Sequence, residues 1–154
     1  MSAWKDHPRW EALCSGQECP ICLRGVPLDV IAELESSWVT MQEHAPARGY
    51  VCLVSRTHAV ELHDLSGAAA STFMRDAQTV SAAVAMATQA VKLNYEIHGN
   101  SIPHLHMHFF PRYRGDQFEG QPINPKLVRQ PVYGPGEFEQ LRNAIADAIV
   151  NRTK

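Results

Sequence analysis

Residues 104–110 read His-Leu-His-Met-His-Phe-Phe and alternate between polar and apolar side chains with a period of two. Successive side chains of a β-strand point to opposite faces, so a strand here carries three imidazoles on one face and packs its other face on a core. Imidazole can act as a nucleophile, a proton donor or a metal ligand at pH 7. The pattern therefore predicts a strand that presents reactive histidines. A metal site is the main alternative, because His-x-His on a strand is a common ligand arrangement, and surface histidines on a half-exposed strand are the other.

The rest of the chain predicts an α+β fold with an antiparallel sheet. The expected elements, in chain order, are strands at 38–42 and 50–55, a helix at about 66–92, strands at 92–97 and 104–110, and a C-terminal helix. The long helix is indicated by apolar residues at alternating spacings of four and three, namely Phe73, Ala77, Val80, Val84, Ala87 and Val91. Residues 115–136 contain four prolines and four glycines and are expected to form an ordered loop.

Composition and charge exclude two classes of function. The 154 residues carry 14 basic and 16 acidic side chains, a net charge of −2, which argues against broad, sequence-independent nucleic-acid binding. No run approaches the about 18 apolar residues of a membrane-spanning helix. The first ten residues are polar and lack the apolar core of a secretory signal. We therefore expect one domain over residues 1–154, located in the cytoplasm, with neither nucleic acid nor a membrane as a partner.

A Cys-x-x-Cys pair, Cys19 and Cys22, lies near the N-terminus. Its spacing is that of one half of a zinc site or of a thioredoxin-like redox pair. The redox interpretation needs a following helix, and residues 23–27, Leu-Arg-Gly-Val-Pro, cannot continue a helix far. A tetrahedral zinc site needs two further ligands. From the spacing alone, a zinc site and a pair of unliganded thiols both remain open.

The histidine strand and its surroundings resemble the histidine triad superfamily of nucleotide hydrolases and transferases, in particular bacterial HIT-domain proteins that are like dinucleoside polyphosphate hydrolases. The run His-Leu-His-Met-His at 104–108, followed by Phe-Phe-Pro-Arg, resembles the family signature. Three other segments are similar to family stretches. Gly49–His58 resembles a stretch of Gly-His, an apolar strand and Pro-Lys-x-His. Leu65-Ser66 resembles the start of the family's long helix, and Gly99–Pro103 resembles its Gly-Gln-Ser-Val-x segment. The resemblance spans residues 19–115, and the C-terminal loop and helix at 116–154 carry no family motif. It implies a HIT-like fold with an antiparallel sheet of about five strands, one long helix and a C-terminal helix.

The resemblance also implies roles for the site residues. In that family the middle histidine attacks the α-phosphorus of a nucleotide and forms a covalent nucleotidyl-histidine. His106 matches this position, with His104 and His108 as the other catalytic residues, and His108 can donate to phosphate oxygens. The matching substrate-binding positions are Asn94, Gly99, Asn100 and Ser101. Gln42 stands where many members carry an aspartate near the ribose. No acidic cluster of the kind that binds magnesium is visible in the sequence, so we expect no catalytic metal.

A metal site is a further implication of the resemblance. Some relatives, including the galactose-1-phosphate uridylyltransferases, carry a zinc ion on two cysteines and two histidines. The matching residues here are Cys19, Cys22, His58 and His104. The resemblance thus implies a structural zinc ion with four protein ligands and no open position for water.

The resemblance implies a nucleotide hydrolase that cleaves at the α-phosphate of dinucleoside polyphosphates such as diadenosine tetraphosphate. Two alternatives within the family are hydrolysis of AMP phosphoramidates and transfer of the nucleotide to phosphate or a sugar phosphate. A non-catalytic nucleotide- or metal-binding module is the alternative from another class. The resemblance further implies a homodimer formed through the long helix and a continuous sheet.

Overall fold

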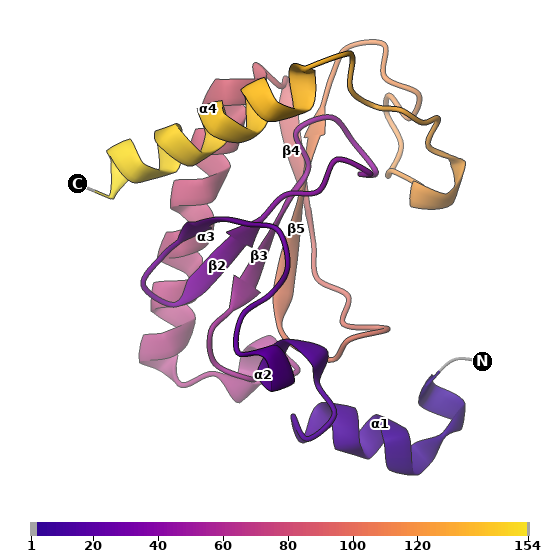
Figure 1. The fold of residues 1–154 in the computed structure, drawn as a ribbon, viewed down its shortest axis with the longest axis vertical. Coiled ribbons are helices and arrows are strands. Elements are labelled where there is room, and N and C mark those ends of the chain that lie inside the picture. The colour runs from indigo at the N-terminus through magenta and orange to yellow at the C-terminus, as the bar shows by residue number, and fades with distance from the viewer. Residues whose placement is uncertain (1–2, 154) are drawn as a thin grey trace.

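The computed structural model describes residues 3–153, whose strands form an antiparallel sheet in the order β1-β2-β3-β5-β4 (Figure 1). The strands are β1 (Val30–Glu33), β2 (Ser37–Thr40), β3 (Val51–Ser55), β4 (Lys92–Glu96) and β5 (His106–Arg112). The helices are α1 (His7–Cys14), α2 (Pro20–Arg24), α3 (Gly67–Thr88) and α4 (Glu137–Arg152), with short 3₁₀ turns η1 (Ala3–Lys5), η2 (Leu62–Asp64) and η3 (Pro125–Leu127). The predicted α+β class is confirmed, whereas the single domain over residues 1–154 stays a prediction.

Strands β2 to β5 correspond to the four strands predicted from the sequence, with ends shifted by at most two residues. Strand β1 completes the sheet of about five strands that the resemblance implied, but its position was not predicted from the sequence. It is four residues long, lies at the edge of the sheet, and pairs with β2 through an irregular register between Val30 and Ala32. Its side chains do not alternate between buried and exposed, so the strand carries no period-two signal.

Helix α3 begins where predicted and ends earlier. The hydroxyl of Ser66 accepts a hydrogen bond from the backbone N–H of Ala69 at 3.2 Å and caps the N-terminus. The predicted end near residue 92 is wrong, because Gln89 adopts a left-handed conformation (φ 56°) that ends the helix at Thr88. Val91, which the predicted stripe included, therefore lies outside the helix and is exposed.

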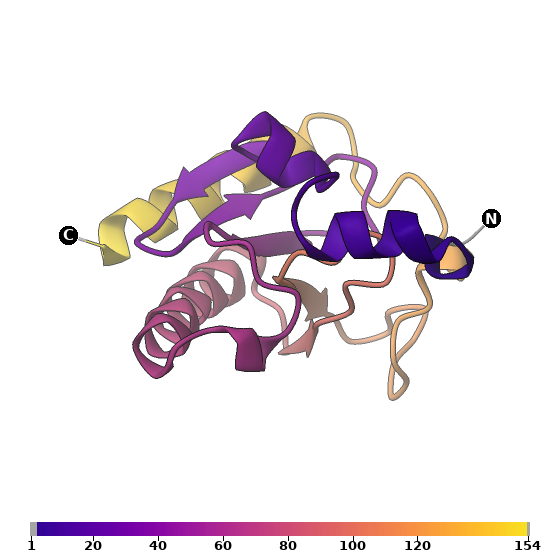
Figure 2. The same cartoon turned by 90° about the horizontal axis from the view of Figure 1, so that it is seen from below.

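Helix α3 packs against one face of the sheet, and α4 packs against α3 and β1 (Figures 1 and 2). The core joins apolar side chains of both helices and of the strands, including Phe73, Val80, Val84, Met107, Phe109, Leu141, Ile145 and Ile149. Because the odd-numbered residues of β5 face this core, the even-numbered ones face away from α3. His106 and His108 are among these outward-facing residues.

The segment 113–136 between β5 and α4 is an ordered loop, as predicted. Tyr133 within it is buried, and its hydroxyl accepts a hydrogen bond from the backbone N–H of Gly49 at 3.0 Å. At the other end of the molecule, α1 projects from the sheet and contacts η1 (Figure 2). Among residues 3–153, the helices lack the combination of length and hydropathy needed to cross a membrane.

Candidate active site

Strand β5 carries the histidine motif but begins at His106. His106 and His108 are half-buried on the face turned away from α3. His104 lies before the strand, and its side chain is 1% exposed and contacts two cysteines. Alternation predicts three imidazoles on the outward face of the motif. The face carries two, because the strand begins after His104.

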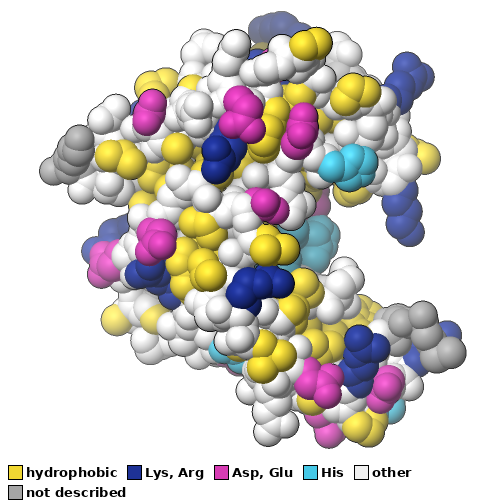
Figure 3. Space-filling model, viewed as in Figure 1, with side chains coloured by type: hydrophobic (Ala, Val, Ile, Leu, Met, Phe, Trp, Pro, Cys, Tyr) yellow, Lys and Arg dark blue, Asp and Glu magenta, His cyan; other side chains and the backbone are white. Residues whose placement is uncertain are grey.

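A pocket of about 400 Å³ opens over the two histidines of β5. Its lining residues come from β5 and from the loop that precedes it: His98, Gly99, Asn100, Ser101, Ile102, His106 and His108. Figure 3 shows this face hollowed between the segment after β5 and helix α1, with histidine side chains in the hollow. Three of the four predicted substrate-binding residues thus lie in one pocket with the predicted nucleophile. Gly99 has a φ of +67°, a left-handed conformation that glycine adopts without strain.

The ring of His106 is oriented by the backbone just before it. Its Nδ1 lies 2.5 Å from the carbonyl oxygen of His104. A carbonyl oxygen can only accept, so Nδ1 carries the proton and donates it. In the neutral imidazole the other ring nitrogen, Nε2, then has a free lone pair, which is the state it needs to act as a nucleophile.

His108 is a neutral imidazole at pH 7. Burial, followed by the neighbouring imidazoles of His106 and His98, lowers the pKa of His108 to about 4. The rings of His106 and His108 meet edge to face, with centroids 4.8 Å apart. Nδ1 of His108 lies 2.6 Å from the hydroxyl of Tyr50. The sequence analysis did not select Tyr50, although it follows Gly49 at the place where the related family carries a histidine.

His98 lines the pocket, although the sequence analysis did not select it. Its ring centroid lies 5.5 Å from that of His108. Its Nε2 lies 2.8 Å from Oε2 of Glu96 and donates to this carboxylate, with the imidazole half exposed at the rim. This pairing depends on how the chain turns after β4, and residue types alone do not predict it.

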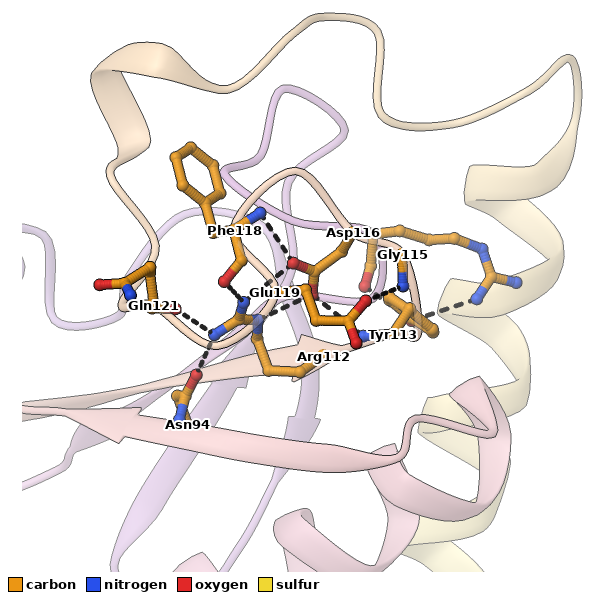
Figure 4. A network of polar contacts seen from close by, with 9 residues as sticks. Asn94, Arg112, Tyr113, Gly115, Asp116, Phe118, Glu119 and Gln121 are labelled. Carbon is orange, nitrogen blue, oxygen red and sulfur yellow. Dashed lines mark hydrogen bonds and ion pairs between the residues drawn. The ribbon is translucent and has the colours of Figure 1, made fainter.

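Asn94, the fourth predicted substrate-binding residue, lies outside this pocket. Its Oδ1 accepts a hydrogen bond from Nη1 of Arg112 at 2.6 Å (Figure 4). Arg112 also donates to both carboxylate oxygens of Asp116 at 2.9 Å and to the carbonyl oxygens of Phe118 and Gln121. This ion pair lowers the pKa of Asp116 to about 2. The network borders a separate cavity of about 640 Å³ and closes the first turn of the loop after β5.

Gln42, where relatives carry an aspartate, lies beside a carboxylate from another segment of the chain. Its Nε2 donates to Oδ2 of Asp29 at 2.9 Å. Asp29 directly precedes β1 and has a positive φ of 55°. The structure thus supplies an acidic group next to Gln42 from a neighbouring segment, which a comparison of single positions in the sequence does not reveal.

Four donor atoms gather beside the first histidine of the motif, all within 4.8 Å of one another: Sγ of Cys19, Sγ of Cys22, Nδ1 of His58 and Nδ1 of His104. Nδ1 of His104 lies 3.4 Å from Cys19 Sγ and 3.6 Å from Cys22 Sγ. Nδ1 of His58 lies 3.3 Å from Cys22 Sγ and 3.2 Å from Nδ1 of His104. A tetrahedral zinc ion with Zn–N of about 2.0–2.1 Å and Zn–S of about 2.3 Å separates its ligand atoms by about 3.3–3.8 Å. The four residues predicted as ligands therefore fit a zinc ion.

Hydrogen bonds direct the lone pairs of both histidines into this cluster. Nε2 of His104 donates to the carbonyl oxygen of Ser55, and Nε2 of His58 donates to that of Cys14, each at 2.8 Å. Each Nδ1 thus keeps a lone pair that faces the thiols. Burial lowers the pKa of His104 and raises the pKa of Cys22 to about 11. A divalent cation here would displace the thiol protons and satisfy the lone pairs.

Helix α2 brings the two cysteines to the same side. Cys19 is its N-cap and Cys22 lies about one turn further along. Gly25, with a φ of 81°, ends the helix at Arg24. The short helix agrees with the prediction from residues 23–27 and differs from the long helix that follows a thioredoxin-like pair.

Comparisons with known proteins place this fold and motif in a family. A family model for the HIT domain matches residues 24–115. A histidine triad protein from Bradyrhizobium japonicum is 30% identical over 78% of this chain and 89% of its own, with a TM-score of 0.68. A Zn-bound histidine triad family protein from Mycobacterium smegmatis is 20% identical over 89% of this chain and 96% of its own, with a TM-score of 0.65. A hypothetical histidine triad nucleotide-binding protein from Sulfolobus tokodaii is also 20% identical, over 91% of this chain and 92% of its own, with a TM-score of 0.62. No curated protein matches the sequence significantly.

The chain belongs to the HIT domain family of histidine triad proteins. Members of this superfamily are in general nucleotide hydrolases or transferases, and some are non-catalytic. Membership therefore assigns the superfamily, whereas catalysis by this chain and the roles of individual residues are proposals.

Proposed function

We propose that this protein is a nucleotide hydrolase that cleaves at the α-phosphate of dinucleoside polyphosphates through a covalent nucleotidyl-histidine on His106. The observation that carries the proposal is the hydrogen bond from Nδ1 of His106 to the carbonyl of His104, which leaves Nε2 free in a pocket. Hydrolysis of AMP phosphoramidates and transfer of the nucleotide to phosphate or a sugar phosphate begin with the same step and are the alternatives to be tested.

The proposed reaction has two displacements at one phosphorus. In the first, Nε2 of His106 attacks the α-phosphorus, and the bond to the bridging oxygen breaks so that the leaving phosphate keeps that oxygen and the electron pair. The hydrogen bond from Nδ1–H to the carbonyl of His104 stabilises the positive charge on the ring. In the second, water attacks the phosphorus and the bond to Nε2 breaks, which regenerates His106 and yields a nucleoside monophosphate and a proton.

Hydrogen-bond donors around the pocket stabilise the negative charge that develops on the phosphate oxygens. The loop Gly99–Ser101 contributes the hydroxyl of Ser101 and the side-chain amide of Asn100, and His108 contributes an imidazole. Donors that are already in place lower the barrier because they need no reorganisation during the reaction. The proposal includes no catalytic metal, since His106 and these donors supply the chemistry.

A substrate panel with trapping of the intermediate tests the proposal. Purified protein is assayed with diadenosine tetraphosphate, an AMP phosphoramidate and ATP, each with and without inorganic phosphate. We expect turnover of diadenosine tetraphosphate and an AMP adduct on the peptide containing His106 in mass spectra. Protein that binds AMP but forms no adduct and turns over nothing in the panel would instead be a non-catalytic nucleotide-binding module.

We further propose that Cys19, Cys22, His58 and His104 hold a structural zinc ion. The chemistry and spacing of the donor atoms support it, and a Zn-bound histidine triad family protein shares the fold. Four protein ligands complete a tetrahedron, so the ion would supply folding energy and leave no position for a reactive water. It would tie α2 to the residue whose carbonyl orients His106.

The homodimer implied by the family resemblance is also a proposal, and the edge of the sheet offers a place for it. Strand β4 lies at that edge, and exposed apolar side chains lie on it and near it: Met86, Val91 and Tyr95. Pairing two β4 strands around a two-fold axis would cover them. Sedimentation equilibrium should give about twice the chain mass of 17.2 kDa, and a monomer at micromolar concentration would contradict the proposal. The cytoplasmic location stays a prediction.

A further inference from the structure

Tyr50 contacts the histidine that the proposed reaction uses as a phosphate donor. It directly precedes β3, and its hydroxyl lies 2.6 Å from Nδ1 of His108. The two rings stack with centroids 5.9 Å apart and an interplanar angle of 22°. The ring of Tyr50 also packs on Phe110, with centroids 5.1 Å apart. These ring contacts hold the hydroxyl beside one chosen nitrogen of His108.

The hydroxyl of Tyr50 has a proton that it can donate in this hydrogen bond. Burial is the largest cause that raises the pKa of Tyr50, so the phenol keeps its proton at pH 7. The thiol of Cys52 interacts with the same hydroxyl, and burial raises the pKa of this thiol to about 12, so it also stays protonated. Sulfur is a weak acceptor and an unprotonated imidazole nitrogen is a strong one. The phenol proton is therefore directed to Nδ1 of His108.

The other groups that face His108 do not compete with Tyr50 for a hydrogen bond to Nδ1 of His108. They are His106 and Phe110 on its own strand, Cys52 on β3, Glu96 on β4 and His98 in the loop after β4. In the described part of the chain, none of them forms a hydrogen bond with a ring nitrogen of His108, and the carboxylate of Glu96 is engaged by His98. The partner that decides which nitrogen of His108 is protonated is thus Tyr50.

We propose that Tyr50 is a positioning residue that selects the tautomer of His108. By donating to Nδ1, it places the single proton of the neutral imidazole on Nε2, the nitrogen left to face the nucleotide. His108 can then donate a hydrogen bond to a phosphate oxygen, whereas the opposite tautomer would present a lone pair to an anion. The inference deepens the proposed hydrolase mechanism and rests on it for the identity of the anion.

The two outward-facing histidines of β5 consequently have opposite tautomers. His106 donates from Nδ1 to a carbonyl and keeps the lone pair of Nε2 for the nucleotide. His108 accepts at Nδ1 from a phenol and keeps the proton on Nε2. One imidazole therefore serves as the nucleophile and the next as a donor, although both come from the same alternating strand.

Tyr50→Phe tests the proposal because it removes the hydroxyl and keeps the ring. In protein labelled with nitrogen-15 in its histidines, long-range nitrogen–proton spectra report which ring nitrogen carries the proton. We expect Nε2–H for His108 in the wild type, and in Tyr50→Phe a mixture of tautomers or Nδ1–H, with the Nδ1–H state of His106 unchanged. The proposal is overturned if His108 is Nδ1–H in the wild type, or stays Nε2–H alone in Tyr50→Phe.

Kinetics of the same variant separate positioning from packing. We expect kcat to fall about 10- to 100-fold, the scale of losing an aligned donor, and KM to change by less than about threefold. Tyr95→Phe is the matched control, because its hydroxyl bonds to Ser81 of α3, 2.6 Å away, and it should leave kcat unchanged. A changed tautomer with unchanged kcat would overturn the positioning role. If the wild type turns over no nucleotide, the proposed function fails, while the spectra still decide what Tyr50 does to His108.

Discussion

Four histidines of this chain, His58, His104, His106 and His108, each place one ring nitrogen within 2.8 Å of an oxygen atom. For three of them the oxygen belongs to a backbone carbonyl, and for His108 it belongs to the phenol of Tyr50. The partner decides which nitrogen keeps a lone pair, and so whether the other side of the ring can bind a metal, attack phosphorus or donate to a phosphate. Three different contacts thus prepare one residue type for the three different functions proposed above.

Replacement of the proposed nucleophile, His106, is the most direct test at the scale of single residues. His106→Ala should lower kcat by at least about 10³-fold, because covalent catalysis depends on a single nucleophile. Circular dichroism should be unchanged, since the side chain lies half-buried on the outward face of β5. His63→Ala is the control, as this histidine is exposed on η2 outside the pocket, and it should retain full activity. A folded His106→Ala protein with wild-type turnover would contradict the assignment.

The ion pair of Asp116 with Arg112 makes stability depend on pH. The folded state holds the pKa of Asp116 at about 2, against about 3.9 in an unfolded chain, so the stabilisation is present above about pH 4 and is lost as the pH falls toward 2. Asp116→Asn should therefore lower the free energy of unfolding by about 1–3 kcal/mol at pH 7. Urea titrations of both proteins should converge as the pH falls through this range. A difference that is the same at pH 7 and pH 2.5 would show that the charge is not the cause.

At the scale of elements, the start of β3 and the end of α3 meet with no room for an additional atom. Gly49 has a φ of +75°, and a Cβ at this position would lie 2.5 Å from Cγ2 of Thr88, the last residue of α3. Both the backbone conformation and the close approach require glycine. This contact joins the end of α3 to the residue before Tyr50, directly ahead of β3.

Gly49→Ala should consequently destabilise the protein by about 2–5 kcal/mol in the free energy of unfolding. Gly67→Ala is the matched control, because Gly67 begins α3 and a Cβ there meets nothing within 4 Å. The control should change stability by less than about 1 kcal/mol, in the stabilising direction. Urea titration measures both variants. Equal effects of the two substitutions would refute the role of the close approach.

For the whole molecule, the cysteine–histidine cluster joins segments that are far apart in sequence: α2, the segment after β3 and the segment before β5. If it holds zinc, Cys22→Ser should lose the metal in elemental analysis, from about one ion per chain. The Tm should fall by at least about 5 °C, because the ion is linked to folding. Cys14→Ser is the control, since only the backbone carbonyl of Cys14 contacts the cluster residue His58, and it should keep both metal and Tm.

The time course of chelation distinguishes a structural ion from a catalytic one. After addition of a chelator, activity and circular dichroism should decay together, because a closed site with four ligands has no position for a reactive water. Immediate loss of activity with an unchanged fold, reversed at once by zinc, would instead indicate metal-activated water and would overturn the nucleophilic role of His106.

The amino-acid sequence by itself determined the fold class and the position of the motif, because these depend on local periodicity. Alternation located β5, four- and three-residue spacing located α3, and the turn residues separated them. The same local signals were insufficient where a tertiary contact decides the outcome. β1 is a short edge strand without alternation, and the left-handed Gln89 ends α3 at Thr88, four residues before the predicted end.

Within the site, the family resemblance implied a nucleotide pocket and a metal cluster, and Gly99, Asn100 and Ser101 do line one pocket with His106. Only the tertiary structure placed Asn94 with Arg112, brought His98 and Tyr50 to His108, and turned His104 away from the other two histidines. The physical reason is that these contacts join residues far apart in the sequence. A hydrogen bond between Tyr50 and His108 joins residues 58 apart, and the contact between Cys19 and His104 joins residues 85 apart, so neither leaves a periodic trace in the chain.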